Sequence, residues 1–229
     1  QQPVWACRTV FHTNRTVYYT AMVKTQPPKP DRPKAANRRT KSSDVEQVLL
    51  DAANSLLVEH GPAGLTVRAV ATQAGVAPMG VYNRFDGKHG LLEALYVQGF
   101  NELRDRVNSA SGPTAHARLR AAADEYRSFA LDSPQHYRLM FEHVSEVEPS
   151  DQAVEQAYES FAALVNLVRA CQDADQLLGD NEVSVAQQLW SAIHGAVSLE
   201  LVGISFTEDP AQTYSDMVDA LLVGLAPMR

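Results

Sequence analysis

The chain has 229 residues and a formal net charge of −7, and 45% of its residues are hydrophobic, which is enough for a normal globular core. It contains no run of about 18 apolar residues, so the sequence predicts no membrane-spanning helix. Cys7 and Cys171 lie far apart and fit no metal-ligand spacing. We therefore expect a cytoplasmic protein that holds neither a metal nor a cofactor.

The charge is distributed unevenly along the chain. Residues 22–41 hold seven Lys or Arg and one Asp, whereas residues 111–229 hold six basic and eighteen acidic residues. The basic end is suited to approach nucleic-acid phosphates, and a solubilising tail is the alternative. Residues 1–42 are predicted to form a flexible basic arm. Because residues 1–21 show no helical period, we expect Met22 to be the natural first residue and 1–21 not to be native.

A first helix is predicted from residue 43. Ser43 and Glu46 form a capping-box pattern, in which each side chain bonds a free backbone N–H of the first turn. Apolar residues then recur at three- and four-residue spacing as far as Leu57, which is the period of one helix face. Gly61 and Pro62 supply a stop.

Residues 66–84 carry the pattern of two short helices joined by a tight turn. Thr66 is a suitable N-cap, Gly75 permits the positive φ of the turn, and Pro78 fits the first turn of the second helix. In such a helix-turn-helix the second helix enters the major groove of DNA, while the first helix crosses the backbone. The sequence therefore predicts a DNA-binding domain over residues 43–90.

The second helix of this motif supplies the predicted base contacts. Met79 can touch a thymine methyl group, Asn83 can pair with a base edge or a phosphate, and Gly80 allows close approach to the groove. The hydroxyl and basic side chains of the motif are predicted phosphate ligands. Each residue taken singly could instead fill the core or lie on a solvated surface. The predicted DNA-binding set is Thr66, Val67, Arg68, Pro78, Met79, Gly80, Tyr82, Asn83, Arg84 and Lys88.

This segment resembles the TetR (tetracycline repressor) family of bacterial regulators. The match spans about residues 44–95 and is carried by Thr66, Val70, Ala71, Ala74, Gly75, Val76, Ala77, Val81, Tyr82, Phe85, Gly87, Lys88 and Leu92. Ala77 stands where the family often has a capping serine, and Met79 is an unusual apolar residue at a base-facing position. The resemblance implies a homodimer that binds a partly palindromic operator and represses transcription until a small ligand binds.

The remainder of the chain reads as helical, and no strand pattern competes. Further helices are predicted at 91–109, 115–132, 135–141, 152–172, 182–206 and 210–225. The expected fold is all-α with about nine helices: a three-helix DNA-binding domain followed, at 91–229, by a helical ligand-binding and dimerisation domain. The last two helices carry the most apolar surface and are the predicted dimer interface. A core within one chain is the alternative.

Trp190, His194 and Gly195 resemble the Trp-His-Gly signature of one class of TetR C-terminal domain, and the run from Tyr137 to Phe141 resembles a second stretch of that class. The resemblance places both on helices that enclose a ligand cavity. Aromatic residues here could line that pocket or fill the core. His194 could bond a ligand, respond to pH, or be a satisfied core histidine. The predicted ligand-binding set is Tyr126, Phe129, Tyr137, Met140, Phe141, Phe161, Trp190 and His194.

The sequence offers little support for a metal site or for catalysis. The acidic and histidine side chains of His136, Glu142, His143 and Glu146 match no firm metal-ligand spacing, so a solvated acidic surface is the better interpretation. The chain has no Gly-rich phosphate loop, no Gly-x-Ser-x-Gly elbow and no His-Glu-x-x-His pair, and we predict that it is not an enzyme.

The sequence thus predicts a ligand-responsive transcriptional regulator, and a helical interaction module without DNA binding is the alternative function. Ligand in the C-terminal domain is expected to shift the spacing of the two recognition helices in a dimer. They would then no longer match successive major grooves, which lie about 34 Å apart. The helix at 91–109 bridges the two domains and is expected to carry this coupling.

Overall fold

The structure is a computed structural model that describes residues 8–12, 15–19, 42–179 and 181–227. The chain divides into two units, residues 1–40 and residues 41–229. The described part of the first unit is a β-hairpin. The described part of the second unit is all α, as predicted.

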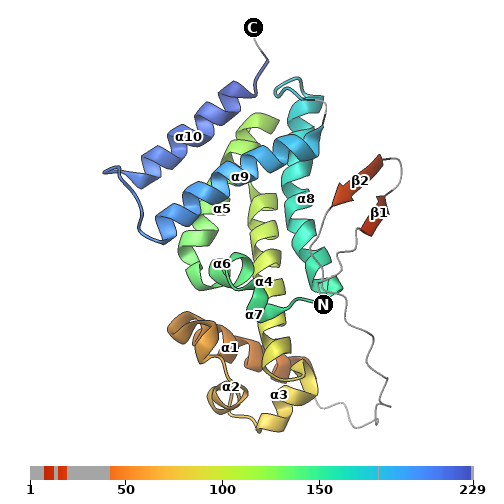
Figure 1. The fold of residues 1–229 in the computed structure, drawn as a ribbon, viewed down its shortest axis with the longest axis vertical. Coiled ribbons are helices and arrows are strands. Elements are labelled where there is room, and N and C mark those ends of the chain that lie inside the picture. Colours follow the sequence, from red (N-terminus) through yellow and green to blue (C-terminus); the bar gives the residue numbers. More distant parts are fainter. Residues whose placement is uncertain (1–7, 13–14, 20–41, 180, 228–229) are drawn as a thin grey trace, which may run out of the picture. The chain divides into compact units, whose positions relative to one another are not determined.

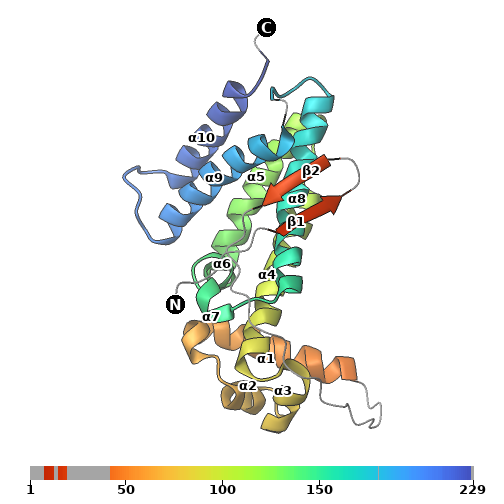
Figure 2. The same ribbon diagram turned by 45° about the vertical axis from the view of Figure 1, so that its right-hand side comes forward.

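The hairpin consists of two antiparallel strands, β1 (Arg8–His12) and β2 (Arg15–Tyr19), which lie side by side in Figure 2. Val10 pairs with Val17 at the middle of the register. Both strands are rich in threonine, valine and aromatic residues, which favour an extended backbone. The prediction of a flexible arm over residues 1–42 did not include these strands. The basic stretch at 22–41 lies outside the described residues.

The helical unit begins with α1 (Ser42–Gly64), α2 (Val67–Gln73) and α3 (Pro78–Phe85). Figure 1 shows these three helices gathered around the first turns of α4 (Lys88–Ser109), at one end of the unit. The small core that they share consists of fully or almost fully buried side chains: Leu49, Ala53, Leu57, Leu65, Val70, Ala71, Val81, Leu91 and Leu95.

The predicted stop of the first helix is present as a kink rather than as an end. Gly61 has φ 65° and ψ −174°, and the three residues after it form a further turn that ends at Gly64. Glycine accepts this positive φ without a Cβ clash. The helix begins at Ser42, but the side chain of Ser43 lies outside the described part, so the predicted capping box stays a prediction.

Helix α4 joins the end that carries α1, α2 and α3 to the rest of the unit. It packs against α1 and α3 near its start and against α5 (Ala115–Asp132), α6 (Pro134–Phe141) and α8 (Asp151–Asp173) further along. Gly99 lies where α6 crosses α4, and a Cβ atom there would come within 2.6 Å of the Met140 sulfur. The short helix α6 is therefore seated closely on the bridging helix.

The described residues form ten helices rather than the predicted nine, because α7 (Val144–Val147) is an additional short helix. Helix α9 (Glu182–Leu201) ends before the predicted boundary at residue 206. The reason is Gly203, whose φ of 72° turns the chain so that the Ile204 N–H donates to the carbonyl of Leu199 (2.9 Å). A loop at 202–209 then leads to α10 (Pro210–Gly224).

The last helix, which belongs to the predicted dimer interface, packs one of its faces against its own chain. Tyr214, Val218 and Leu222 are buried, and the Tyr214 hydroxyl donates to the Ala123 carbonyl of α5 (2.5 Å). These side chains therefore belong to the core within one chain, and Met217 and Leu221 are partly buried against the same core, whereas Val223 is exposed. Within the ranges that the structure describes, no helix has the length and apolarity needed to cross a membrane.

Candidate DNA-binding and effector sites

The helix-turn-helix has the local geometry that its sequence predicts. The hydroxyl of Thr66 accepts a hydrogen bond from the Ala69 N–H (3.1 Å), which caps α2. Gly75 adopts φ 66° in the turn, and the Val76 N–H donates to the carbonyl of Ala71 (2.9 Å). These bonds set the direction in which α3 leaves the turn. Ala77 occupies the N-cap of α3 and provides no side-chain bond, as expected for alanine.

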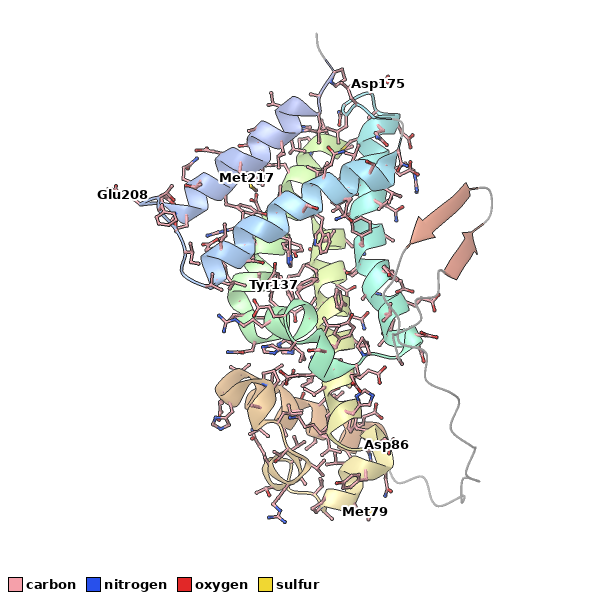
Figure 3. The ribbon with its side chains drawn as sticks, in the orientation of Figure 1. Met79, Asp86, Tyr137, Asp175, Glu208 and Met217 are labelled. Atoms are coloured by element: carbon pink, nitrogen blue, oxygen red, sulfur yellow. The ribbon has the colours of Figure 1, made fainter. Side chains whose placement is uncertain are left out.

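One face of α3 is buried and the other is open. Val81 and Phe85 pack into the core, whereas Met79 and Tyr82 are 63% and 53% exposed and Asn83 is also exposed. In Figure 3, Met79 lies at the outer edge of the helical unit. The predicted base-facing residues are therefore accessible.

The other predicted DNA contacts divide into two groups. Thr66, Arg68 and Pro78 are exposed, and Val67, Gly80 and Lys88 are half-buried. Arg84 is different, because its Nη1 donates to the Gly80 carbonyl of its own helix (3.3 Å) and its Nε is buried without a hydrogen-bond partner. To contact a phosphate, the Arg84 side chain would have to break its hydrogen bond to the Gly80 carbonyl. Of the predicted DNA contacts, the one by Arg84 is therefore the least supported by the structure.

Helix α3 is joined rigidly to α4. Asp86 ends α3 with a left-handed backbone (φ 55°), and Gly87 follows with φ 95°. A Cβ atom on Gly90 would lie only 1.6 Å from the carbonyl oxygen of Phe85, so the end of α3 rests directly on the first turn of α4. Any displacement of the start of α4 therefore carries α3 with it.

Four of the predicted ligand-binding side chains meet in a polar cluster among α5, α6 and α9. Nδ1 of His194 lies 2.7 Å from the Tyr137 hydroxyl and 2.9 Å from the Tyr126 hydroxyl. Trp190 Nε1 donates to the Tyr126 hydroxyl (3.3 Å). In Figure 3, Tyr137 lies among the helices, well away from Met79. We call these four residues the Tyr-His cluster.

Two further predicted residues extend the cluster with aromatic surface. The Phe141 ring lies 4.8 Å from the His194 ring, and the Phe161 ring lies 6.1 Å from that of Trp190 (centroid distances). The remaining two point elsewhere. Phe129 is fully buried beneath the Arg106 guanidinium (5.8 Å), and Met140 packs against Gly99 of α4. They belong to the core and to the α4–α6 contact.

Ser198 was not among the predicted ligand-binding residues, and its Oγ lies 3.5 Å from the Tyr137 hydroxyl. Its position four residues after His194 places both on one face of α9, and this spacing was the available signal. Burial lowers the pKa of His194 from its usual value, and the charge of Glu142 opposes this effect. The uncharged imidazole is therefore the favoured form in the cluster.

The weak metal candidate is not assembled. His136 points to α1, where its Nε2 lies 2.8 Å from Asn54 Oδ1, while His143 bonds Glu146 (2.9 Å). Among the residues that the structure describes, no group of three or more His, Cys, Asp or Glu side chains has metal-site geometry. Cys171 is buried, and desolvation raises the pKa of its thiol to about 11. A buried, protonated thiol is unreactive.

Comparison with known proteins relates both ends of the helical unit to one family. Residues 49–95 match bacterial regulatory proteins of the tetR family, and residues 119–221 match the tetracyclin repressor-like C-terminal domain. An uncharacterized HTH-type transcriptional regulator, Rv0681, of Mycobacterium tuberculosis (strain ATCC 25618 / H37Rv) is 27% identical over 178 residues, which is 77% of this chain and 79% of that protein.

Two other similarities extend this finding. The HTH-type transcriptional activator FasR of Mycolicibacterium smegmatis is 31% identical over 123 residues, or 52% of this chain and 56% of FasR. A solved protein of unknown function from Rhodococcus sp. RHA1 superposes with a TM-score of 0.73 at 28% identity, covering 80% of this chain and 96% of that one. The helix-turn-helix, the helical C-terminal part and these matches agree: the chain belongs to the TetR family and is a DNA-binding transcriptional regulator.

Proposed function

We propose that this regulator is a repressor that binds a palindromic operator as a homodimer and is released by a small molecule. The observation that carries the DNA-binding part is the open face of α3, where Met79, Tyr82 and Asn83 are exposed on a helix whose other face is buried. Lys88 and Arg68 lie beside this face and would contact phosphates. Met79 would touch a thymine methyl group and thereby contribute to operator choice.

The effector is proposed to bind beside the Tyr-His cluster in the C-terminal domain. Helix α6 carries Tyr137 of this cluster, and it also rests on α4 through Met140 at Gly99. The recognition helix α3 also contacts the first turn of α4, at Gly90. A change at the cluster could therefore pass through directly packed helices, from α6 to α4 and from α4 to α3. Effector binding would favour a spacing of the two recognition helices that no longer fits successive major grooves.

The homodimer is proposed to form through α9, α10 and the loop that joins them. Apolar side chains that the chain itself leaves exposed gather on these elements: Leu199, Val202, Ile204, Phe206 and Val223. Three of them, Leu199, Ile204 and Phe206, line a groove of about 330 Å³ together with Met217 and other residues of α9, α10 and the loop. An exposed apolar area of this kind is typical of a surface that a partner covers. A twofold arrangement of two helices from each subunit would cover it.

We further propose that the protein acts in the cytoplasm, on the nucleoid, and that it is not an enzyme. The location follows from the proposed operator binding, because the DNA target lies on the nucleoid. An enzymatic activity is not needed, because binding to the operator and to the effector accounts for regulation. Similarity to relatives does not decide between repression and activation, since FasR is named an activator. We favour repression because release by a ligand needs only a loss of operator affinity.

Selection of genomic DNA fragments by the purified full chain tests this function. We expect a palindromic site with two half-sites, bound by two chains. Lys88→Ala should weaken binding to all sequences and lower the salt dependence by about one phosphate contact, whereas Met79→Ala should alter the preferred bases. Glu59→Ala, on the exposed surface of α1, is the matched control and should change neither.

Two results would decide against the proposal. Recovery of fragments with no shared sequence and no salt-dependent affinity would instead support a helical interaction module without DNA binding. Placement of the recovered sites upstream of genes whose transcription falls when the regulator is deleted would identify an activator.

A further inference from the structure

The ring of Tyr82 on α3 lies against Gly87, the residue that precedes α4. A Cβ atom on Gly87 would come within 3.2 Å of Tyr82 Cε1 and within 3.6 Å of Cδ1, so the ring occupies the space that a side chain at position 87 would need. Gly87 is buried, whereas Tyr82 is 53% exposed. One edge of the ring therefore rests on the glycine, while much of the side chain stays open to solvent.

The backbone at Gly87 is held in a conformation that favours glycine. Its φ of 95° and ψ of −153° lie in a region that a residue with a Cβ atom enters only at a cost. At the end of α3 the Asp86 N–H donates to the Tyr82 carbonyl (3.2 Å), and in the first turn of α4 the Leu91 N–H donates to the Gly87 carbonyl (3.3 Å). Because Leu91 is fully buried, the backbone at Gly87 has little room to retreat.

Tyr82 is therefore the partner in this contact that gives way. A methyl group at position 87 would push Cε1 outward, and Cε1 is bonded to the ring carbon that carries the hydroxyl. The hydroxyl would follow the tilt of the ring. A tyrosine side chain has only two rotatable bonds before its ring, so a support at one edge limits where the hydroxyl can lie.

The supported hydroxyl belongs to the face of α3 that is open. Tyr82 is exposed there together with Met79 and Asn83. Tyrosine hydroxyls are among the groups that donate to phosphate oxygens of DNA, and such contacts carry no direct sequence information. Unlike a lysine or an arginine, an uncharged hydroxyl releases no counterion from the DNA. Its contact would strengthen binding to every sequence and leave the salt dependence unchanged.

We infer that Gly87 is a positioning residue for operator binding: its missing side chain seats the Tyr82 ring, and this seat holds the Tyr82 hydroxyl where it donates to a backbone phosphate. The inference rests on the proposed operator binding by α3. It adds a residue that acts on the DNA contact through another side chain, and it assigns Tyr82 to the DNA backbone and not to the bases.

Operator affinities of full-chain variants test this seat. Tyr82→Phe removes only the hydroxyl and should lower the affinity for the selected genomic fragments by about tenfold or more, because one hydrogen bond is lost in each half-site. The loss should be similar for all fragments, and the salt dependence should not change. Gly87→Ala should have the same effect. The double variant should bind no more weakly than Tyr82→Phe alone, because both changes remove one contact.

Gly61→Ala is the matched control for backbone strain. Gly61 has φ 65° and ψ −174°, in the same region as Gly87, but the atom nearest to an added Cβ lies 3.9 Å away. Both alanine variants should be less stable than the wild type, and affinities are compared at a temperature at which circular dichroism shows both to be folded. Only Gly87→Ala should lose operator affinity. An equal loss in Gly61→Ala overturns the inference, because strain would then explain both.

Four further results would also overturn it. Wild-type affinity in Tyr82→Phe excludes the phosphate contact, and this variant leaves the backbone intact, so it is decisive even if Gly87→Ala does not fold. Altered base preference in Tyr82→Phe would place the hydroxyl on a base. Additive losses in the double variant would show that Gly87 acts by another route. A weaker salt dependence in Gly87→Ala would show that the adjacent Lys88 has lost its phosphate instead.

The same measurements separate this inference from the proposed function. If the wild-type protein selects genomic fragments but the variants fail as described, only the role of Gly87 is wrong. If the wild-type protein selects no fragment, the proposed operator binding is wrong.

Discussion

His136 Nε2 lies 2.8 Å from Oδ1 of Asn54, so that a hydrogen bond joins α6 to α1, which packs with the helix-turn-helix. The amide of Asn54 donates in turn to Gln98 Oε1 on α4 (3.2 Å). His136 is 9% exposed, and its neighbour in sequence, Tyr137, belongs to the Tyr-His cluster. Adjacent residues of one short helix therefore contact α1 on one side and the Tyr-His cluster on the other, and a rotation of α6 must affect both contacts.

The first prediction concerns the energy of this hydrogen bond. Asn54→Leu leaves the buried His136 without its partner and should lower the free energy of unfolding by about 1–3 kcal/mol. Replacing both partners, as Asn54→Leu with His136→Phe, removes the unpaired polar group and should recover part of this loss. Urea denaturation of the single and double variants measures the difference. A double variant that loses the sum of the two single effects would mean that the bond is not coupled.

The second prediction is a loss of stability in mild acid. Burial lowers the pKa of His136, which the charge of Glu102 only partly opposes, and burial also lowers the pKa of His194. Both histidines therefore bind protons more readily in the unfolded chain. The stability they provide is complete above the usual histidine pKa of about 6.5 and is lost as the pH falls below it toward their folded values. The free energy of unfolding should be lower at pH 5.5 than at pH 7.5.

The variant His136→Gln tests how much of this pH dependence comes from His136. His136→Gln cannot gain a proton, so the fall in stability between pH 7.5 and pH 5.5 should be smaller than in the wild type, provided that the variant folds at pH 7.5. Circular dichroism verifies the fold, and urea titrations at the two pH values measure the slope. An unchanged slope would show that His136 does not contribute.

Local patterns were sufficient to predict the helix-turn-helix. Thr66, Gly75 and Pro78 each act on bonds within a few residues, and the structure confirms the cap, the positive φ and the start of α3. Arg84 was less predictable, because its return to the Gly80 carbonyl depends on how the space around α3 is filled. Sequence type alone does not distinguish a basic side chain that faces DNA from one that folds back.

The C-terminal domain shows why pairing across helices is harder to predict. The aromatic residues of the cluster were identified, but Phe129 and Met140 carry the same apolar signal and lie in other contacts. On α10, which was predicted to form part of the dimer interface, Tyr214 and Leu222 are buried within the chain, whereas Val223 is 74% exposed. Periodicity reports which residues share a helix face. It does not report whether that face meets the same chain or a partner.

The third prediction separates folding from DNA contact at Gly80. A Cβ atom there would make only ordinary contacts, 3.8 Å from Val76 and 3.9 Å from Arg84. Gly80→Ala should therefore raise the stability of α3 by up to about 1 kcal/mol, since alanine is the better helix former. Operator affinity should nevertheless fall, because the added methyl group stands where the helix approaches the groove. Higher stability together with unchanged affinity would place the DNA away from Gly80.

The fourth prediction uses the missing cap of α3. Ala77 has the extended backbone of an N-cap but no side-chain acceptor. Ala77→Ser adds an oxygen that can accept from a free N–H of the first turn, and it should stabilise the protein by about 0.5–2 kcal/mol. Thr66→Ala removes the corresponding bond from α2 and is the reciprocal control, with a loss of similar size. Chemical denaturation that shows no gain for Ala77→Ser would indicate that serine does not bond this helix end.

The last prediction concerns the proposed dimer surface. Leu199 on α9 and Val223 on α10 are 51% and 74% exposed within one chain, so a substitution at either does not disturb the core. A charge placed in an apolar interface must lose its hydration without a partner, and twofold symmetry introduces it twice. Leu199→Asp and Val223→Asp, each made singly, should therefore shift the protein from two chains to one in light-scattering measurements.

A matched control distinguishes loss of the interface from a general effect of added charge. Val58 on α1 is 61% exposed but lies outside α9 and α10, and Val58→Asp should leave the dimer intact. The monomeric variants should also bind the palindromic operator much more weakly than the wild type. A single chain presents only one recognition helix and can occupy only one half-site at a time. Dimers that persist in both aspartate variants would place the interface elsewhere on the helical unit.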